Sequence, residues 1–344
     1  MEVLQTLQIT WFALWGILWA VYFMLDGFVL GAGMLHNFLA KNENEKKAMI
    51  AIVGPVWNGN EVWLITAGGA TFAAFPTTYA LMFSYLYTAL LLLLFALIIR
   101  GVSLEFRGKV ANDAWKRLWD TGILLGSVLP ALLLGVAFGN IFEGLPMDAA
   151  GFHGNLFTLL NPYGLLTGIL FVALFLVHGA IYASVKTGED LSARAKDVAD
   201  KGWAVLLIVA VAFLVYTAFA TGLFLNYMST PVLFVVPLIA VAALILIKVF
   251  LARGDALKAF AASCVTIVTV CFTGVIGLFP NLIPSSLDPT YSMTIYNSSS
   301  SKLTLAIMTA VALIFVPIVI AYKIWVYRVF REKISPGEAA GEIY

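Results

Sequence analysis

Long apolar runs separated by short polar stretches occupy almost the whole chain. Nine of these runs are about as long as the roughly 20 residues that a helix needs to cross a bilayer. We expect membrane-spanning helices near residues 9–36, 49–74, 77–99, 118–141, 162–185, 202–226, 231–250, 258–280 and 303–327. Pro76 should separate the second span from the third, because proline cannot continue a helix from the preceding turn. The pattern predicts an all-α polytopic membrane protein with nine transmembrane helices.

The polar stretches differ in charge, and this difference predicts the orientation of the chain. Basic residues are concentrated in alternate loops, so that all twenty Lys and Arg residues except Lys302 fall on one side of the predicted membrane. The positive-inside rule assigns that side to the cytoplasm. We therefore expect the N-terminus outside and the C-terminus in the cytoplasm.

Composition excludes several classes of protein. Hydrophobic residues make up 62% of the chain and charged residues 11%, and the mean hydropathy is +0.96. Soluble proteins have about 45–50% apolar and about 25% charged residues. So few charges cannot form the basic surface of a nucleic-acid-binding protein. We expect a multi-pass protein of a plasma membrane, surrounded by lipid and without a nucleic-acid partner.

We expect one transmembrane domain over residues 1–344, with a weak internal repeat. A short segment of the first span resembles one in the fifth span, and the same offset aligns Asp26 with His178. Both spans start outside, so the repeat would be parallel, with units 1–150 and 151–285. This organisation corresponds to two four-helix bundles plus one peripheral helix. Chance similarity between apolar helices is the alternative.

Two carboxylates, Asp26 and Glu61, lie deep inside predicted spans. Inserting an ionisable side chain at mid-membrane costs roughly 2.5–3.5 kcal/mol on insertion scales. A residue of this kind is therefore first interpreted as a functional one. The assignment of Lys and Arg to loops leaves no cation at that depth. We therefore expect these carboxyls to be protonated, hydrogen-bonded to polar neighbours or hydrated. Proton conduction or ligand contact is one interpretation, and a hydrogen-bonded node that only joins helices is the other.

The segment around Glu61 is polar for a membrane span. Two indoles and two amides lie within two helical turns of this carboxyl, at Trp57, Asn58, Asn60 and Trp63. Residues three or four apart share a helix face. Because such a cluster is expensive in lipid, we expect it to face the protein interior.

Metal and haem ligands are scarce. The three histidines are His36, His153 and His178, and the last is the one well inside a predicted span. Haem is most often held by His, or by His with Met. No cluster of His, Cys or carboxylates has the spacing of metal ligands. We expect no metal site, no haem ligated by this chain and no catalytic residue of its own.

Several longer motifs indicate a family. They are DGFVLGAG at 26–33, GPVWNGNEVWL at 54–64, AGGATFAAFP at 67–76, RGVSLEFR at 100–107, NPYGLL at 161–166 and FPNLIPSS at 279–286. With these motifs the sequence resembles subunit II of the cytochrome bd quinol oxidases. The motifs are spread over nearly the whole chain, and the segment 54–64 is the most specific of them.

The resemblance implies a haem-free partner of a larger subunit I with a similar nine-helix fold. Subunit I would carry the quinol-oxidation loop, haem b and haem d. The complex would oxidise quinol and reduce oxygen to water in the bacterial plasma (inner) membrane. A small single-helix accessory subunit would be a further partner. Some relatives hold a quinone in subunit II, in the cavity that haems fill in subunit I, and a quinone site here stays open.

The resemblance also implies roles for individual residues. Asp26 matches the acid of a proton path from the cytoplasm, and we expect Glu61 to belong to the same path. The polar cluster that would support this path or contact a quinone consists of Trp57, Asn58, Asn60, Trp63, Arg100 and Glu105. Many relatives have aspartate at position 58. Because an amide cannot carry a proton by titrating, we expect no second proton route through Asn58.

Two other functions stay open. A proton-coupled secondary transporter acting alone would also use buried acids and repeats, although such repeats are often inverted rather than parallel. A purely structural subunit would use Asp26 and Glu61 only to join helices.

Overall fold

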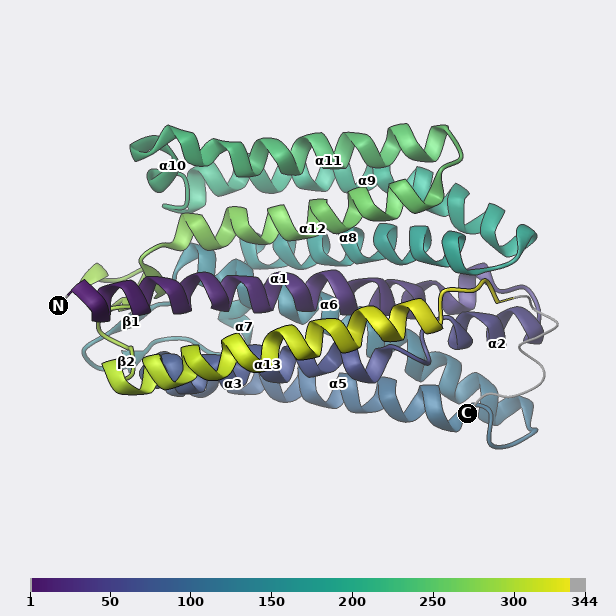
Figure 1. Ribbon diagram of the computed structural model, residues 1–344, viewed down its shortest axis with the longest axis horizontal. Coiled ribbons are helices and arrows are strands. Elements are labelled where there is room, and N and C mark those ends of the chain that lie inside the picture. The colour runs from purple at the N-terminus through teal and green to yellow at the C-terminus, as the bar shows by residue number, and fades with distance from the viewer. Residues whose placement is uncertain (1, 335–344) are drawn as a thin grey trace.

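The computed structural model describes residues 2–334 and is almost entirely helical, which confirms the predicted all-α class. Figure 1 shows long helices lying side by side along one axis. Among residues 2–334, eight helices are long and apolar enough to cross a membrane. They are α1 (Glu2–Leu39), α5 (Tyr87–Phe106), α6 (Asp113–Glu143), α8 (Pro162–Lys186), α9 (Glu189–Ala220), α11 (Val235–Ala252), α12 (Ala256–Leu278) and α13 (Lys302–Val329). The C-terminus, predicted to be cytoplasmic, lies outside the described residues.

The predicted span 49–74 is not one continuous helix. A short helix, α2 (Glu43–Ala51), ends in a turn, and α3 (Trp57–Ala74) begins only after it. The turn contains Pro55, and a proline disfavours helical geometry at the residue before it. With 18 residues, α3 is about 27 Å long at 1.5 Å per residue. That is slightly less than the roughly 30 Å hydrocarbon core, and the predicted count of nine spans is not confirmed.

Pro76 separates two helices as predicted. The helix α3 ends at Ala74, and α4 (Pro76–Tyr85) begins with the proline in its first turn. The predicted span 77–99 is itself divided, because Leu86 leaves helical geometry between α4 and α5.

The end of the bundle that holds Glu2 is closed by short elements, which Figure 1 shows near the N-terminus. Two antiparallel hairpins lie there, β1 (Met147–Asp148) with β2 (Gly151–Phe152) and β3 (Asn281–Ile283) with β4 (Met293–Thr294). Backbone hydrogen bonds of Leu145 with Pro284 and Ser286, 2.9 and 3.0 Å long, join the loops that carry these hairpins. The remaining short helices are α7 (Leu156–Leu159), α10 (Leu225–Ser229), η1 (Pro231–Phe234) and η2 (Pro289–Tyr291). We call the opposite end, with α2 and the basic loops, the basic end.

The helix α1 is central, and it packs against α3, α6, α8 and α12. The backbones of α1 and α8 are in direct contact. A Cβ atom added to Gly31 would lie 1.9 Å from the carbonyl oxygen of Phe175, and one added to Gly179 would lie 2.4 Å from the amide of Ala32. Close helix approach at small residues is the usual way in which membrane helices gain packing energy.

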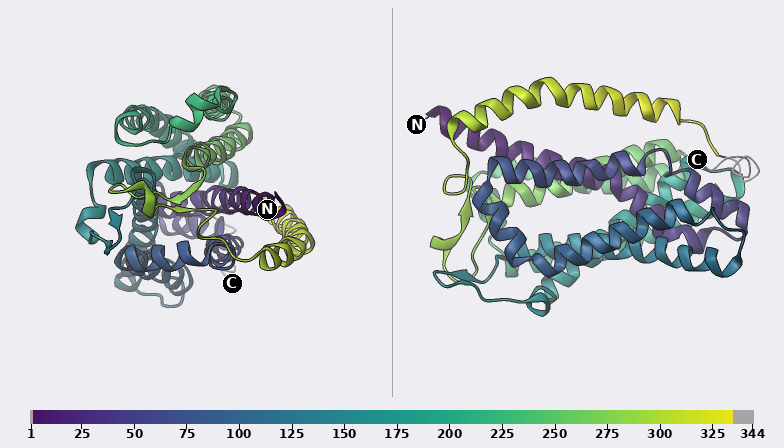
Figure 2. Two further views of the ribbon diagram at one scale, coloured as in Figure 1. Left: turned by 90° about the vertical axis from the view of Figure 1, so that its left-hand side faces the viewer. Right: turned by 90° about the horizontal axis from the view of Figure 1, so that it is seen from below.

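The last helix, α13, lies along the outer edge of the bundle, as Figure 2 shows. It contacts α1 and α3, and most of its side chains are exposed. Among the other long helices, α6 packs against both α5 and α8, α8 also packs with α9 and α12, and α11 packs with α12. The predicted arrangement of two four-helix bundles plus one peripheral helix stays a prediction. The predicted repeat of residues 1–150 and 151–285 stays a prediction.

Candidate functional site

Asp26 and Glu61 meet on one buried arginine. Arg100 donates hydrogen bonds from Nη2 to both carboxylate oxygens of Asp26, at 3.0 and 3.2 Å, and to Oε1 of Glu61. The side chains of Asp26 and Arg100 are 0% and 1% exposed, whereas that of Glu61 is 23% exposed. The structure thus joins α1, α3 and α5 by an ion cluster of two carboxylates and one guanidinium, which we call the carboxylate cluster.

The expectation that no cation lies at the depth of these acids was wrong. The sequence analysis assigned Arg100 to a loop, but α5 continues to Phe106 and keeps Arg100 inside the bundle. The backbone of Arg100 lies directly against α6, where a Cβ atom on Gly126 would be 2.7 Å from the Arg100 amide. This close approach gives the arginine its depth, because the long side chain then extends toward α1 rather than toward water.

A second group of polar side chains lies beside the carboxylate cluster. Asn60 donates from Nδ2 to the carbonyl of Leu25, at 2.7 Å, and its Oδ1 accepts from the hydroxyl of Tyr327 at 3.0 Å and from Nζ of Lys323 at 3.4 Å. Asn60 precedes Glu61, and Leu25 precedes Asp26. The amide of Asn60 therefore connects α13 with both carboxylate-bearing helices.

Sequence reasoning missed Lys323 and Tyr327. Lys323 was assigned to the basic C-terminal end, although the predicted span 303–327 already contains it. In the structure it lies within α13, and its Nζ occupies the space above Gly59, where a Cβ atom would be only 2.2 Å away. A lysine inside an otherwise apolar run is a signal that could have identified it.

The predicted polar cluster divides in the structure. Trp57 and Trp63 are buried, and Trp57 packs on the backbone of α5 at Gly101. Asn58 and Glu105, in contrast, are exposed. The expectation that the segment around Glu61 faces the protein interior was wrong for Asn58, because its side chain lies on the outer face of α3 with the exposed Val62 and Ile65.

The histidines of the chain serve as hydrogen-bonding residues. His178 lies on α8 with Nδ1 2.7 Å from the hydroxyl of Ser263 and Nε2 3.0 Å from the carbonyl of Met24. His36 contacts Asp120 at 2.7 Å near the basic end. In the part of the chain that the structure describes, no group of three or more His, Cys, Asp or Glu side chains could hold a metal ion.

A second ion network closes the basic end. Asp120 accepts from Lys46 at 2.6 Å and from Arg107, in addition to its contact with His36. Arg107 also forms a two-pronged pair with Glu43, at 2.9 and 3.0 Å. This hydrogen bond from Arg107 holds the pKa of the Glu43 carboxyl below its ordinary value. The network joins α1, α2, α6 and the end of α5.

The Glu43–Arg107 pair predicts a specific acid sensitivity. A carboxyl whose pKa is lower in the folded state stabilises the fold above its unfolded pKa, and this stabilisation is lost as pH falls through the folded pKa. We expect the melting temperature of the purified complex to fall less between pH 6 and pH 4 in Glu43→Gln than in the parent protein. Asp197→Asn, at an exposed pair with Lys201, is the matched control. Identical slopes in all three proteins would contradict the assignment.

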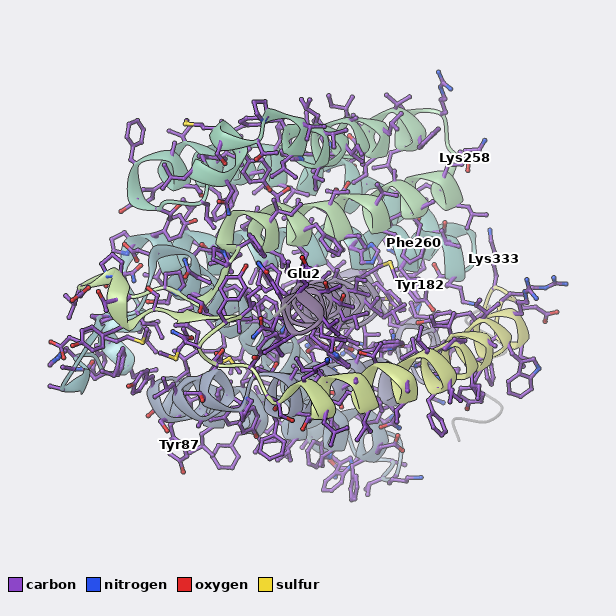
Figure 3. All side chains as sticks on the ribbon, turned by 60° about the vertical axis from the view of Figure 1, so that its left-hand side comes forward. Glu2, Tyr87, Tyr182, Lys258, Phe260 and Lys333 are labelled. Atoms are coloured by element: carbon purple, nitrogen blue, oxygen red, sulfur yellow. The ribbon has the colours of Figure 1, made fainter. Side chains whose placement is uncertain are left out.

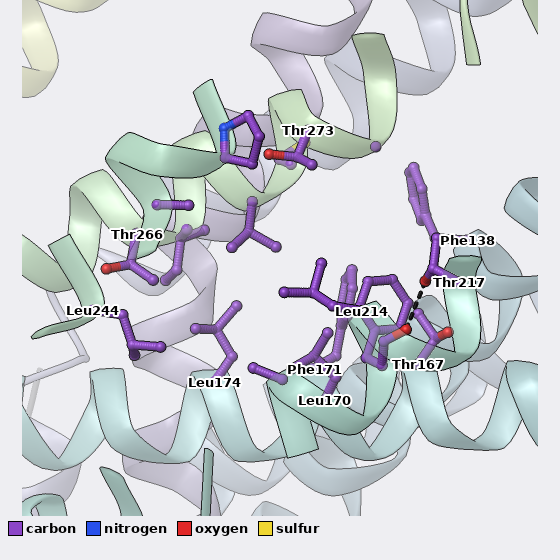
Figure 4. A pocket seen from close by; sticks show the side chains of 18 of the residues that line it. Phe138, Thr167, Leu170, Phe171, Leu174, Leu214, Thr217, Leu244, Thr266 and Thr273 are labelled. Carbon is purple, nitrogen blue, oxygen red and sulfur yellow. Dashed lines mark hydrogen bonds between the residues drawn. The ribbon is translucent and has the colours of Figure 1, made fainter. Parts of the chain in front are cut away.

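Two apolar cavities lie between helices of the described part of the chain, residues 2–334. The larger, with a volume of about 570 Å³, lies between α1, α3, α4, α5 and α6, and its lining includes Trp15, Trp19 and Gly68. The smaller, of about 130 Å³, lies between α8, α9, α11 and α12. Figure 4 shows its leucine and phenylalanine lining, with the hydroxyls of Thr167 and Thr217 at one end. Both of these hydroxyls donate to carbonyls of their own helices, which leaves this cavity apolar in character.

Comparison with solved structures identifies the class of membrane protein to which this fold belongs. A chain of the bd oxidase from Geobacillus thermodenitrificans superposes with a TM-score of 0.78 at 16% identity, over 94% of this chain and 98% of that one. At this identity the likeness defines the fold, which is that of a bd oxidase subunit.

The sequence comparisons define the family. Residues 7–330 match the family model of cytochrome bd terminal oxidase subunit II. The chain is 36% identical to cytochrome bd-I ubiquinol oxidase subunit 2 of Escherichia coli K12, over 96% of this chain and 97% of that protein. It is also 36% identical to cytochrome bd ubiquinol oxidase subunit 2 of Bacillus subtilis, over 97% and 99%. The chain therefore belongs to the cytochrome bd oxidase subunit II family.

Family membership confirms the resemblance described above and establishes the general function of the chain. The chain is a multi-pass subunit of a quinol:oxygen oxidoreductase of the bacterial inner membrane, and it works with a subunit I. A transporter acting alone is no longer required to explain the buried acids.

Proposed function

We propose that this chain is the haem-free subunit of the oxidase and that its carboxylate cluster carries protons from the cytoplasm toward subunit I. In this proposal subunit I holds haem b and haem d and reduces oxygen, and this chain supports assembly. The basic end lies in the cytoplasm, because cytoplasmic loops of membrane proteins carry the excess of Lys and Arg. The observation that carries the proposal is the pair of carboxylates, Asp26 and Glu61, on the single guanidinium of Arg100.

This arrangement suits proton transfer better than a simple ion pair does. One carboxylate with one arginine is neutral, and protonating it leaves an uncompensated buried cation. Two carboxylates with one arginine carry a net charge of −1, so the cluster can take up one proton and become neutral. Arg100 remains paired whichever of Asp26 and Glu61 holds the proton, and the charge can pass from one to the other without breaking every contact.

Glu61 is the member of the cluster from which protons would leave. Its side chain is 23% exposed, whereas Asp26 is fully buried. The same outer face of α3 exposes Asn58, Val62 and Ile65. We propose that this face contacts subunit I, because a partly exposed carboxylate facing lipid would be unfavourable.

The larger apolar cavity supports a quinone in this subunit as a second ligand. Its volume of about 570 Å³ lies within the range of about 300–1,000 Å³ that is typical of small-molecule sites. It is bordered by the indoles of Trp15 and Trp19 and by the backbone of Gly68 and Gly69. A Cβ atom added to either glycine would have no other atom within 4 Å, so the space beside them is open. A flat ring and an isoprenoid tail match this lining.

The substitution Asp26→Asn tests the proton role. The amide keeps the shape and can still accept from Arg100, but it cannot carry a proton. We expect quinol-dependent oxygen uptake to fall about tenfold or more, the lower part of the range for proton-transfer groups, while the reduced-minus-oxidised haem spectrum stays normal. The exposed Asp197→Asn should change neither reading.

The alternatives give different results in the same experiment. A purely structural Asp26 would lose haem content and oxygen uptake together in Asp26→Asn. Full turnover in a fully haem-loaded Asp26→Asn complex would remove Asp26 from the proton path.

A further inference from the structure

A cavity at the basic end is lined by Tyr327, the residue whose hydroxyl donates to Asn60 beside the carboxylate cluster. Its volume is about 310 Å³, and it lies between the turn that joins α2 to α3, the end of α8 and the end of α13 with the segment that follows it. We call this cavity the vestibule. A water molecule needs about 10–15 Å³ of space for its centre, so the vestibule has room for a cluster of waters. Its polar lining consists of Tyr182, Lys186, Tyr327, Glu332 and Lys333.

The walls of the vestibule are fixed by hydrogen bonds that join distant parts of the chain. Lys186 donates from Nζ to the carbonyls of Phe330 and Glu332, the latter at 2.6 Å, and its own carbonyl accepts from the amide of Ile334 at 2.8 Å. Tyr182 donates to the carbonyl of Ile52 at 2.9 Å. These bonds hold the end of α13 to α8 and to the α2–α3 turn.

Aromatic packing supports the inner wall. The ring of Tyr182 stacks on Phe28 of α1, with centroids 4.0 Å apart, and contacts Phe260 of α12 at 5.5 Å. Figure 3 shows Tyr182 and Phe260 close together inside the bundle, with Lys333 farther out at the basic end. The packed rings of Tyr182, Phe28 and Phe260 therefore close the inner end of the vestibule. Tyr327 lies at the remaining part of this wall.

Tyr327 connects the vestibule with the carboxylate cluster. Its ring lines the cavity, and its hydroxyl donates to Oδ1 of Asn60 at 3.0 Å. Asn60 directly precedes Glu61 in α3 and is itself fully buried. Lys323, one turn before Tyr327 in α13, contacts the same amide oxygen at 3.4 Å. A single hydroxyl thus separates a water-sized space at the basic end from Asn60, which donates to the carbonyl of Leu25, the residue before Asp26.

We propose that the vestibule is the entrance of the proton path and that Tyr327 relays protons from it toward Asp26. In each transfer a protonated vestibule water gives its extra proton to the Tyr327 oxygen. The original hydroxyl proton leaves to a water at Asp26 as the phenol turns away from Asn60. One O–H bond breaks as another forms, so the tyrosine stays neutral. Asn60 positions the phenol and does not itself titrate. This inference rests on the proposed proton role of the carboxylate cluster.

A competing entrance past His36 fits less well. A cavity lined by His36 and Arg100 has only about 10 Å³ of space for water centres, which is room for about one water. The buried Nδ1 of His36 and the Nε and Nη1 of Arg100 find no hydrogen-bond partner within residues 2–334, so they can hold such a water. The approach to it, however, is closed by the ion network in which Asp120 contacts His36, Lys46 and Arg107.

The substitution Tyr327→Phe, in the complete oxidase with subunit I, removes the relay hydroxyl and keeps the ring. We expect oxygen uptake to fall about fivefold to tenfold with a normal haem spectrum, and the solvent deuterium isotope effect on turnover to rise. Tyr322→Phe is the matched control, because Tyr322 is exposed on the same helix. It should leave both readings unchanged. Normal turnover and an unchanged isotope effect in Tyr327→Phe would overturn the relay role.

Blocking the vestibule tests the entrance without altering Tyr327. Ala51→Cys places a thiol in its wall, in a background where Cys264 and Cys271 are alanine. In inverted membrane vesicles we expect a cationic, membrane-impermeant thiosulfonate to lower oxygen uptake severalfold, whereas Ala193→Cys, exposed on α9, labels without effect. Full activity after complete labelling at position 51 would overturn the proposal that protons enter through the vestibule.

Asp26→Asn in the same series distinguishes the two proposals. If Asp26→Asn loses turnover while the labelled Ala51→Cys and Tyr327→Phe complexes keep it, the carboxylate path stands and the vestibule is overturned. If Asp26→Asn keeps full turnover, the proton role of the cluster fails and the vestibule proposal fails with it. If Tyr327→Phe does not assemble, the labelling of Ala51→Cys decides.

Discussion

Replacing Arg100 by leucine should prevent the oxidase from accumulating in the membrane. The substitution leaves two buried carboxylates, Asp26 and Glu61, without their shared cation. Removing one partner of a buried ion pair typically costs about 3–5 kcal/mol, and here two acids lose the same partner. Since whole domains are stable by only about 5–15 kcal/mol, we expect little assembled complex, measured as haem d absorbance per milligram of membrane protein. Arg117→Leu, at an exposed arginine, should accumulate normally.

A triple variant separates the structural cost from the loss of proton transfer. Arg100→Leu combined with Asp26→Asn and Glu61→Gln contains no unpaired buried charge, and neutral replacements of whole ion clusters are often tolerated. We expect this variant to regain much of the haem content of the parent protein while oxygen uptake stays at least about tenfold lower. If Arg100→Leu alone accumulated normally, the ion cluster would not be the junction of α1, α3 and α5 that we describe.

Arg100 also shows why the site was only partly predictable. Depth in the membrane was deduced from where apolar runs end, and such a run cannot distinguish a loop arginine from one in the last turns of a buried helix. Arg100 is held inside by the close approach of α5 to α6 at Gly126, which is a tertiary contact. The acids themselves were identifiable, because a carboxyl far from any loop is rare enough to stand out.

The same limit explains the error at Asn58. Helical periodicity places Asn58 and Glu61 on one face of a helix, but it does not reveal what covers that face. Asn58 is exposed, whereas Asn60, two residues away, is fully buried under Lys323 and Tyr327 of α13. The partner of Asn60 lies more than 260 residues along the chain, so no local pattern near α3 could indicate it.

Other features of the fold were local enough to predict. Pro76 separates α3 from α4 because its effect does not depend on distant residues. Gly27 and Gly31, four residues apart in the sequence, have the spacing of small residues that is typical of helix packing in membranes, and Gly31 does contact the backbone of α8. The turn before α3 was missed because the residues around Pro55 are as apolar as the spans on both sides, and a hydropathy pattern continues through them.

Gly31→Ala should have the second large effect. The added methyl group would lie 1.9 Å from the carbonyl oxygen of Phe175 and 2.9 Å from the Cα of Gly179, both of which are backbone atoms. A side chain could rotate away, but here α1 and α8 must separate. Overpacking of a core costs about 1–3 kcal/mol and occasionally more, and we expect the upper part of that range. The measurement is the melting temperature of the detergent-purified complex.

Gly108→Ala is the control for this prediction, because nothing lies within 4 Å of a Cβ atom at the exposed Gly108. The same methyl group there should leave the melting temperature within experimental error. Gly31 lies five residues after Asp26 on α1. Separation of α1 from α8 should therefore shift Asp26 relative to Arg100 and lower oxygen uptake together with stability. Equal melting temperatures for Gly31→Ala and Gly108→Ala would show that α1 and α8 are not in backbone contact in the assembled oxidase.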